Sequence, residues 1–330
     1  MFLDGGGIRG LSTMIVLQEL MHKIQDRHKL PSLPKPCEVF NLASGIGTGG
    51  LIVIMLFRLE MAIDQAIDAY IKLTEHAFSE RKWLWWQEGT FKASRLEEAV
   101  LELIMDALGL DKIKAKEVRI FVCPVSSRDV SPPTRFRTWN SSGDAGCDCT
   151  IVEAARATCA AETVFKGINI GAESIHPRGL GCNNPTEYIL QEAISVFPSE
   201  GISCVVSLGT GTVSQIGLDV LSHSPNTSSR NLVDTLRRMV ADCEDRSQNI
   251  TQQFSNIQDL YFRVNVDQGL QDMLMDEWRR VDDVRKYTEQ YLGRQDIVDQ
   301  VERLISRLLV EPTKQSSTTY SFLKPGKAFR

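Results

Sequence analysis

Residues 41–50 read NLASGIGTGG, and this stretch decides how the rest of the sequence is interpreted. A strand predicted from Glu38 to Ala43 enters a glycine-rich turn, and a helix is predicted from Leu51 onward. That order matches a nucleophile elbow, G-x-S-x-G, in which a serine hydroxyl lies on a sharp strand-to-helix turn. Here a glycine stands where the serine is expected. The five residues are Gly45, Ile46, Gly47, Thr48 and Gly49.

Composition and charge limit the classes of protein that the sequence can encode. Of 330 residues, 42% are hydrophobic and 24% are charged, as in ordinary globular proteins, and the length allows one large α/β domain or two smaller ones. A formal net charge of -5 argues against nucleic acid as the main partner. No apolar run reaches the roughly 18 residues of a transmembrane helix, so any predicted membrane contact is transient.

The cysteines and the N-terminal residues predict a cytoplasmic protein without a metal or cofactor. The eight cysteines are scattered, and only Cys147 and Cys149 lie close together, without the second pair that a zinc site needs. We therefore expect reduced thiols. Met1 to Asp4 lead directly into a functional-looking loop, so no signal peptide is predicted.

Apolar periodicity predicts alternating strands and helices, and hence an α/β fold. We expect one domain over residues 1–310, mostly helical from about residue 212, and a polar, flexible tail over residues 311–330. The predicted helices include Leu11–Arg27, Leu51–Leu59, Ile63–Phe78, Leu96–Leu108 and Ile151–Ala161. The predicted strands include Phe2–Asp4, Val118–Val125, Cys204–Gly211 and Tyr261–Val266.

Two further glycine-rich stretches accompany the elbow. The first, DGGGIRG, runs from Asp4 to Gly10, where successive backbone N–H groups can converge on an anion or a developing oxyanion. A nucleotide phosphate loop is the alternative, but the stretch lacks the lysine of that motif. The second, GLGCNNP, runs from Gly179 to Pro185 and precedes another predicted helix.

These three stretches together resemble the patatin-like phospholipase family, which has D-G-G-G-x-R-G as its oxyanion loop, G-x-S-x-G as its elbow and D-G-[GA] as the carrier of a catalytic aspartate. Further blocks, including VVSLGTG and YFRVNVDQGL, look like the fungal-type branch. The resemblance implies a three-layer α/β/α fold with a mainly parallel central sheet and a helical C-terminal portion. It also implies a lipid acyl hydrolase that uses a Ser–Asp dyad.

The sequence departs from the family pattern at both dyad positions. Gly47 stands at the serine position, and Pro177 stands at the aspartate position, followed by Arg178 instead of glycine. Neither Gly47 nor Pro177 has a group that can attack an ester or accept a proton. Ser44 lies on the strand side of the turn and is a poor replacement. We therefore predict that the usual dyad hydrolysis does not occur.

The oxyanion loop is intact, which predicts a binding site for a carbonyl or carboxylate oxygen. By resemblance, its donors are the amides of Gly5, Gly6 and Gly7, beside Gly47 and Thr48 at the elbow. Arg9 either braces this loop or contacts the substrate.

Two residues near the motifs are candidate acid–base groups. His176 adjoins the lost aspartate, and imidazole suits proton transfer near neutral pH, although a solvated loop histidine is the alternative. Glu162 stands where relatives usually have proline, and is either a surface residue or a partly buried base.

These residues leave two main classes of function open, and lipid acyl hydrolysis is a further alternative. The first is a repurposed enzyme of the isomerase, cyclase or lyase type, acting on a hydrophobic carbonyl or acyl-like small molecule. The second is a pseudoenzyme that binds an acyl lipid or a protein without catalysis. The third is residual lipid acyl hydrolysis of the phospholipase A kind. Trp83, Trp85 and Trp86 could line a hydrophobic entrance, touch a membrane interface or pack as an ordinary loop.

Overall fold

The computed structural model describes ten ranges of the chain. The described residues are 1–80, 82, 90–108, 119–123, 135–138, 149–160, 164–171, 173–175, 186–212 and 243–308. The candidate residues Glu162, His176 and Pro177, the three neighbouring tryptophans and the predicted tail over residues 311–330 lie outside them.

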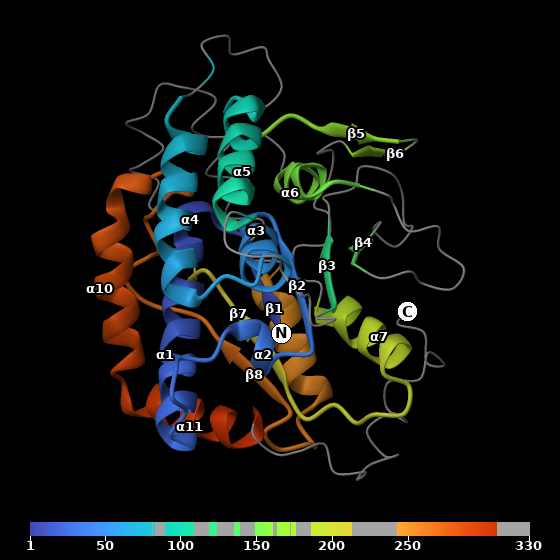
Figure 1. The fold of residues 1–330 in the computed structure, drawn as a ribbon. Coiled ribbons are helices and arrows are strands. Elements are labelled where there is room, and N and C mark those ends of the chain that lie inside the picture. Colours follow the sequence, from blue (N-terminus) through green and yellow to red (C-terminus); the bar gives the residue numbers. More distant parts are fainter. Residues whose placement is uncertain are drawn as a thin grey trace.

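Helices and strands alternate over most of the described chain (Figure 1). The strands are β1 (Phe2–Leu3), β2 (Leu42–Ile46), β3 (Arg119–Cys123), β4 (Phe136–Arg137), β5 (Ile168–Ile170), β6 (Glu173–Ile175), β7 (Val205–Leu208) and β8 (Tyr261–Val264). The α-helices are α1 (Gly10–His28), α2 (Pro36–Val39), α3 (Thr48–Val53), α4 (Ile63–Phe78), α5 (Ala93–Leu108), α6 (Ile151–Cys159), α7 (Thr186–Val196), α10 (Val281–Leu292) and α11 (Gln295–Leu308). Residues 243–253 are also helical, Ile54–Arg58 continue α3 as a π-helix, and short 3-10 turns cover Gly7–Arg9 and Trp278–Arg280.

The central sheet has the strand order β4-β3-β2-β1-β7-β8. Its strands pair in parallel except β4, which runs antiparallel to β3 at one edge. Strands β5 and β6 form a separate antiparallel pair. The mainly parallel sheet that the sequence predicts is therefore confirmed.

Helices cover both faces of this sheet. On one face, apolar side chains of β1, β2 and β3 pack against α7, as Phe2, Ile46 and Ile189 illustrate. On the other face, α1, α3, α4, α5 and α6 share a larger core with Leu3 and Ala43. Figure 1 shows α1 and α4 on the opposite side of the sheet from α7. This arrangement is the predicted α/β/α layering.

The order of the strands creates a switch point at β1. The chain passes from β1 to β2 and β3 on one side, and later adds β7 and β8 on the other. Because β1, β2 and β7 are parallel, the loops that follow them lie together at the carboxyl ends of the strands. Crevices at the carboxyl ends of strands, beside such a switch point, are where open α/β sheets bind ligands.

The strand before the elbow begins later than the sequence predicts. The predicted strand ran from Glu38 to Ala43, but residues 36–39 form the short helix α2 and β2 begins at Leu42. Pro36 occupies the first helical position, and the Lys35 N–H donates to Glu38 Oε2 at 2.8 Å, so local capping overrides the apolar pattern.

Within the described residues, no helix combines the length and the apolar character that crossing a membrane requires.

A buried ion pair joins the first strand to the last strand of the sheet. Arg263 on β8 donates from Nη2 to Asp4 Oδ2 and to Glu244 Oε1, both at 2.6 Å, and from Nη1 to Ser207 Oγ at 2.9 Å. Asp4 is almost fully buried, and this burial raises its pKa, while Arg263 opposes the rise. Asp4 therefore acts as a brace beneath its loop.

We predict that Arg263→Met lowers the free energy of unfolding by about 3–5 kcal/mol, because it leaves a buried carboxylate without its charge partner. Chemical denaturation measures the change. The control is Arg294→Met, which removes a more exposed arginine paired with Asp267 and Asp296 and should shift the melting temperature far less. Equal effects of the two substitutions would contradict the bracing role.

Candidate functional site

The turn between β2 and α3 has the backbone geometry of a nucleophile elbow. Gly47 has φ of 57° and ψ of -130°, and α3 begins at the next residue. A Cβ added at Gly47 would lie 3.5 Å from Gly5 Cα, which is ordinary van der Waals contact. The elbow therefore has room for a side chain at position 47 but carries none.

The glycines on either side of position 47 are fixed by close packing. A Cβ at Gly49 would lie 2.5 Å from the Asp4 carbonyl oxygen and 2.8 Å from the Leu3 carbonyl carbon. A Cβ at Gly45 would lie 2.7 Å from the backbone nitrogen of Gly50. Real Cβ atoms do not approach backbone this closely, so the start of α3 lies against the end of β1 only because these two residues are glycine.

The elbow and the glycine loop after β1 meet through the side chain of Thr48. Its Oγ1 accepts hydrogen bonds from the N–H groups of Gly6 at 3.1 Å and Gly7 at 3.0 Å. Thr48 is 9% exposed. The structure thus brings together five of the predicted oxygen-binding residues: Gly5, Gly6, Gly7, Gly47 and Thr48. Of the three predicted loop amides, those of Gly6 and Gly7 already donate to the Thr48 hydroxyl.

Arg9, the sixth predicted residue of this set, lies fully buried beneath the loop. Its Nε donates to the carbonyl of Thr210 at 2.7 Å, and its Nη2 donates to the carbonyl of Gly211 at 2.6 Å. Burial lowers the pKa of its guanidinium to about 10, so it stays charged near neutral pH. These contacts favour the bracing alternative over direct substrate contact.

Several residues that hold the loop were not found by sequence reasoning. Tyr70 on α4 donates from Oη to the carbonyl of Gly7 at 2.6 Å, and burial raises its pKa, with partial opposition from a hydrogen bond to Thr48. The Met275 carbonyl accepts from the Ile8 N–H at 2.9 Å. The signal for Tyr70 was its place in the apolar stripe of α4, because a buried tyrosine hydroxyl needs a partner.

Ser44 lies away from the elbow site. Its Oγ is buried and, within the described part of the chain, has no hydrogen-bond partner. Alternation along β2 places it on the same face as Leu42 and Ile46, which packs toward α7. This placement supports the prediction that Ser44 does not replace the missing serine.

The proton-transfer roles stay predictions, because both candidate residues lie outside the described ranges, as do Pro177 and Arg178. Among the residues that the structure does describe, no group of three or more His, Cys, Asp or Glu side chains could hold a metal ion.

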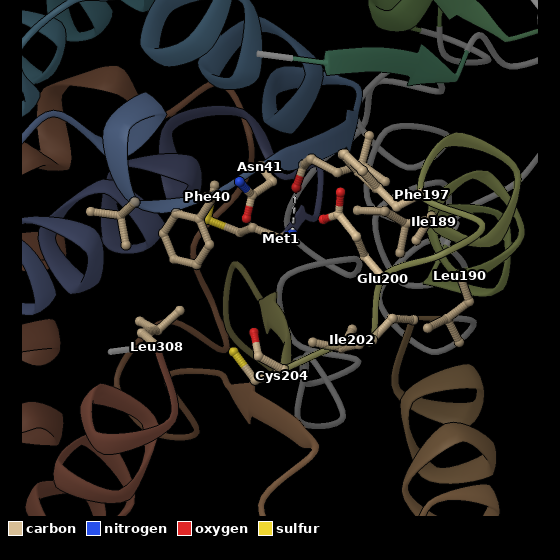
Figure 2. Close-up of a pocket in the computed structure, with 16 residues that line it drawn as sticks. Met1, Phe40, Asn41, Ile189, Leu190, Phe197, Glu200, Ile202, Cys204 and Leu308 are labelled. Atoms are coloured by element: carbon tan, nitrogen blue, oxygen red, sulfur yellow. Dashed lines mark hydrogen bonds between the residues drawn. The ribbon is translucent and has the colours of Figure 1, made fainter. Parts of the chain in front are cut away.

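A cavity of about 170 Å³ lies at the amino-terminal ends of the strands (Figure 2), whereas the elbow lies at their carboxyl ends. Leu42 and Val205, near the start of their strands, line it together with Phe40, Ile189 and Phe197. It is a separate feature from the elbow site, because β2 runs from this cavity toward the elbow.

Comparison with known proteins agrees with this geometry. A family model described as patatin-like phospholipase matches residues 1–189, more than half of the chain. The chain belongs to the patatin-like phospholipase family.

Curated relatives of this patatin-like chain are similar at low identity. Calcium-independent phospholipase A2-gamma of Mus musculus is 25% identical over 258 residues, which cover 74% of this chain and 32% of that protein. Patatin-like phospholipase 1 of Plasmodium falciparum is 24% identical over 339 residues, which cover 93% and 49%. Phospholipase A I of Arabidopsis thaliana is 24% identical over 275 residues, which cover 64% and 20%. The chain therefore spans about a third of the mouse relative's length and about half of the Plasmodium relative's length.

The close packing of the patatin-like elbow gives a matched pair of substitutions. We predict that Gly49→Ala lowers the free energy of unfolding by at least about 3 kcal/mol, since its Cβ meets backbone that cannot retreat. Gly47→Ala should lower it less, by about 1–3 kcal/mol, the cost of holding a residue with a side chain in a sparsely populated positive-φ conformation. Denaturant titration compares the two, and a Gly49→Ala protein as stable as Gly47→Ala would contradict the packing argument.

Proposed function

We propose that this protein binds a hydrophobic carbonyl or acyl-like small molecule at the glycine loop and acts on it without hydrolysis, in a reaction of the isomerase, cyclase or lyase type. The observation that carries the proposal is Gly47, which keeps the backbone conformation of an elbow nucleophile while having no side chain. Acyl transfer through position 47 requires a nucleophilic atom that glycine lacks.

The glycine loop supplies the electrophilic part of such a reaction. Backbone N–H groups that converge on one oxygen stabilise negative charge as it develops there, for example in an enolate. The loop is held from below by Arg9 and from the side by Tyr70, so its amides are preorganised. Glu162 and His176 are the proposed proton donors and acceptors.

A non-catalytic acyl-binding role is the second candidate. It is favoured by Thr48, whose hydroxyl already occupies the amides of Gly6 and Gly7. A ligand that needs only to be held could use the space above Gly47 without these two donors. Relatives named phospholipases keep lipid acyl hydrolysis as the third possibility, which would require a nucleophile at a position other than 47.

We predict that the native protein does not hydrolyse p-nitrophenyl butyrate and that a fluorophosphonate probe does not label it. Gly47→Ser alone should give little activity, because a neutral hydroxyl without an adjacent base is a weak nucleophile. The triple variant Gly47→Ser, Pro177→Asp, Arg178→Gly should give detectable turnover, since it restores both dyad groups. Release of p-nitrophenol at 405 nm measures this.

The control for the triple variant carries Gly47→Ala with the same two other substitutions, and should stay inactive. Native turnover that the fluorophosphonate abolishes would refute the non-hydrolytic proposal.

We predict that the native protein accelerates exchange of the α-hydrogens of 2-undecanone with D₂O, followed by NMR. His176→Ala or Glu162→Gln should slow that exchange by about 100-fold if the residue transfers the proton. His28→Ala, at an exposed position ending α1, is the matched control. Near-normal rates in both variants would remove these residues from the mechanism, and no acceleration by the native protein would favour the binding role.

A further inference from the structure

The hydroxyl of Thr48 stands where an oxygen of a ligand would be bound. Two backbone N–H groups, from Gly6 and Gly7, converge on its Oγ1 at 3.1 and 3.0 Å. These distances lie within the range at which oxyanion-binding donors contact their oxygen, about 2.7–3.1 Å. The site is therefore formed, and its occupant is a neutral hydroxyl of the protein.

The two amides are held in place by contacts that leave them little freedom to move. A Cβ at Gly6 would lie 2.7 Å from Thr210 Cβ, so the loop packs directly on that side chain. At Gly7, the same test gives 2.6 Å to the carbonyl carbon of Met275, and Tyr70 bonds the Gly7 carbonyl. Opening of the loop to admit a second oxygen would have to break these contacts.

The Thr48 side chain is the part that can move. Its hydroxyl position depends on a single torsion, χ1, with three staggered wells. Rotation of about 120° would carry Oγ1 off both amides and away from the Tyr70 side chain, which it also hydrogen-bonds, and would leave the backbone unchanged.

We propose that Thr48 is a displaceable internal ligand of the oxygen site, and that it makes the site selective for anionic oxygens. The proposal rests on the proposed function, since it assumes that an acyl-type ligand approaches this loop. A neutral ester or ketone oxygen would exchange one neutral hydrogen-bond acceptor for another, with little gain. A carboxylate or enolate oxygen accepts charge-assisted hydrogen bonds, which are about twice as strong as neutral ones, and can displace the hydroxyl.

The preferred ligand class is therefore a fatty carboxylate, or a carbonyl compound that ionises to an enolate on the protein. An intact neutral ester is disfavoured. The side chain of Thr48 thus adds a specificity that the glycine loop alone does not have, because the bare amides would accept either kind of oxygen.

The experiment titrates protein that carries both ¹⁵N-glycine and ¹³C-methyl-threonine labels with hexanoate and, separately, with methyl hexanoate. For the native protein, hexanoate should shift the Gly6 and Gly7 amides and the Thr48 γ-methyl resonance, and methyl hexanoate should not. Thr48→Ala should bind hexanoate at least fivefold more tightly and also respond to the ester. Thr48→Ser, which keeps the hydroxyl, should behave like the native protein.

Thr74→Ala is the matched control, since Thr74 is a buried threonine of α4 whose hydroxyl donates to the Ile71 carbonyl. It should leave hexanoate affinity unchanged. Hexanoate affinity that is equal or weaker in Thr48→Ala would overturn the proposal and make Thr48 a structural latch. If that variant does not fold, the native protein decides: shifts of both loop amides without movement of the Thr48 methyl would also overturn it.

The same titration separates this proposal from the proposed function. Hexanoate shifts at Gly5 and Gly47 alone would support acyl binding and refute displacement of Thr48. If hexanoate shifts none of these glycines, the proposed function fails. Formate then tests displacement by itself, with movement of the Thr48 methyl supporting it and no movement refuting it.

Discussion

The structure around the site depends on one buried arginine. Arg9 is removed from water, which is costly for a charge, and hydrogen bonds to the main-chain carbonyls of Thr210 and Gly211 offset part of that cost. Because those carbonyls follow β7 and Arg9 follows β1, the contact ties two neighbouring strand ends together. The glycine loop packs against this contact, which holds the loop conformation in place.

Backbone packing at the carboxyl ends of the same strands explains why the turn has elbow geometry with glycine at position 47. The positions that demand glycine are 45 and 49, where the start of α3 lies against backbone, and position 47 contacts little. A serine at the elbow contributes chemistry but almost no packing. Glycine at position 47 is therefore compatible with an intact turn, because the packing depends on positions 45 and 49.

The sequence predicted the elements whose signal is local. The apolar stripe from Ile63 to Phe78 matched α4 at both ends, and the apolar runs identified β3 and β7 within a few residues. It misplaced the strand before the elbow, because Pro36 and Glu38 cap a short helix there. It missed Tyr70 and Arg263 as partners of the loop, since their contacts span 63 and 259 residues and leave no local pattern. The two candidate acid–base residues remain known from sequence alone.

The missing nucleophile and the occupied amides bear on each other chemically. In acyl transfer, attack on a neutral ester creates the negative oxygen that two converging amides stabilise. Without an attacking group at Gly47, an ester on this site would keep a neutral carbonyl oxygen, which has little advantage over the Thr48 hydroxyl. Only a ligand that arrives as an anion, or that becomes one by losing a proton, would gain from those amides. Under the proposed function, the glycine at position 47 and the Thr48 hydroxyl on the loop amides point the same way, toward ligands whose charge does not depend on attack by the protein.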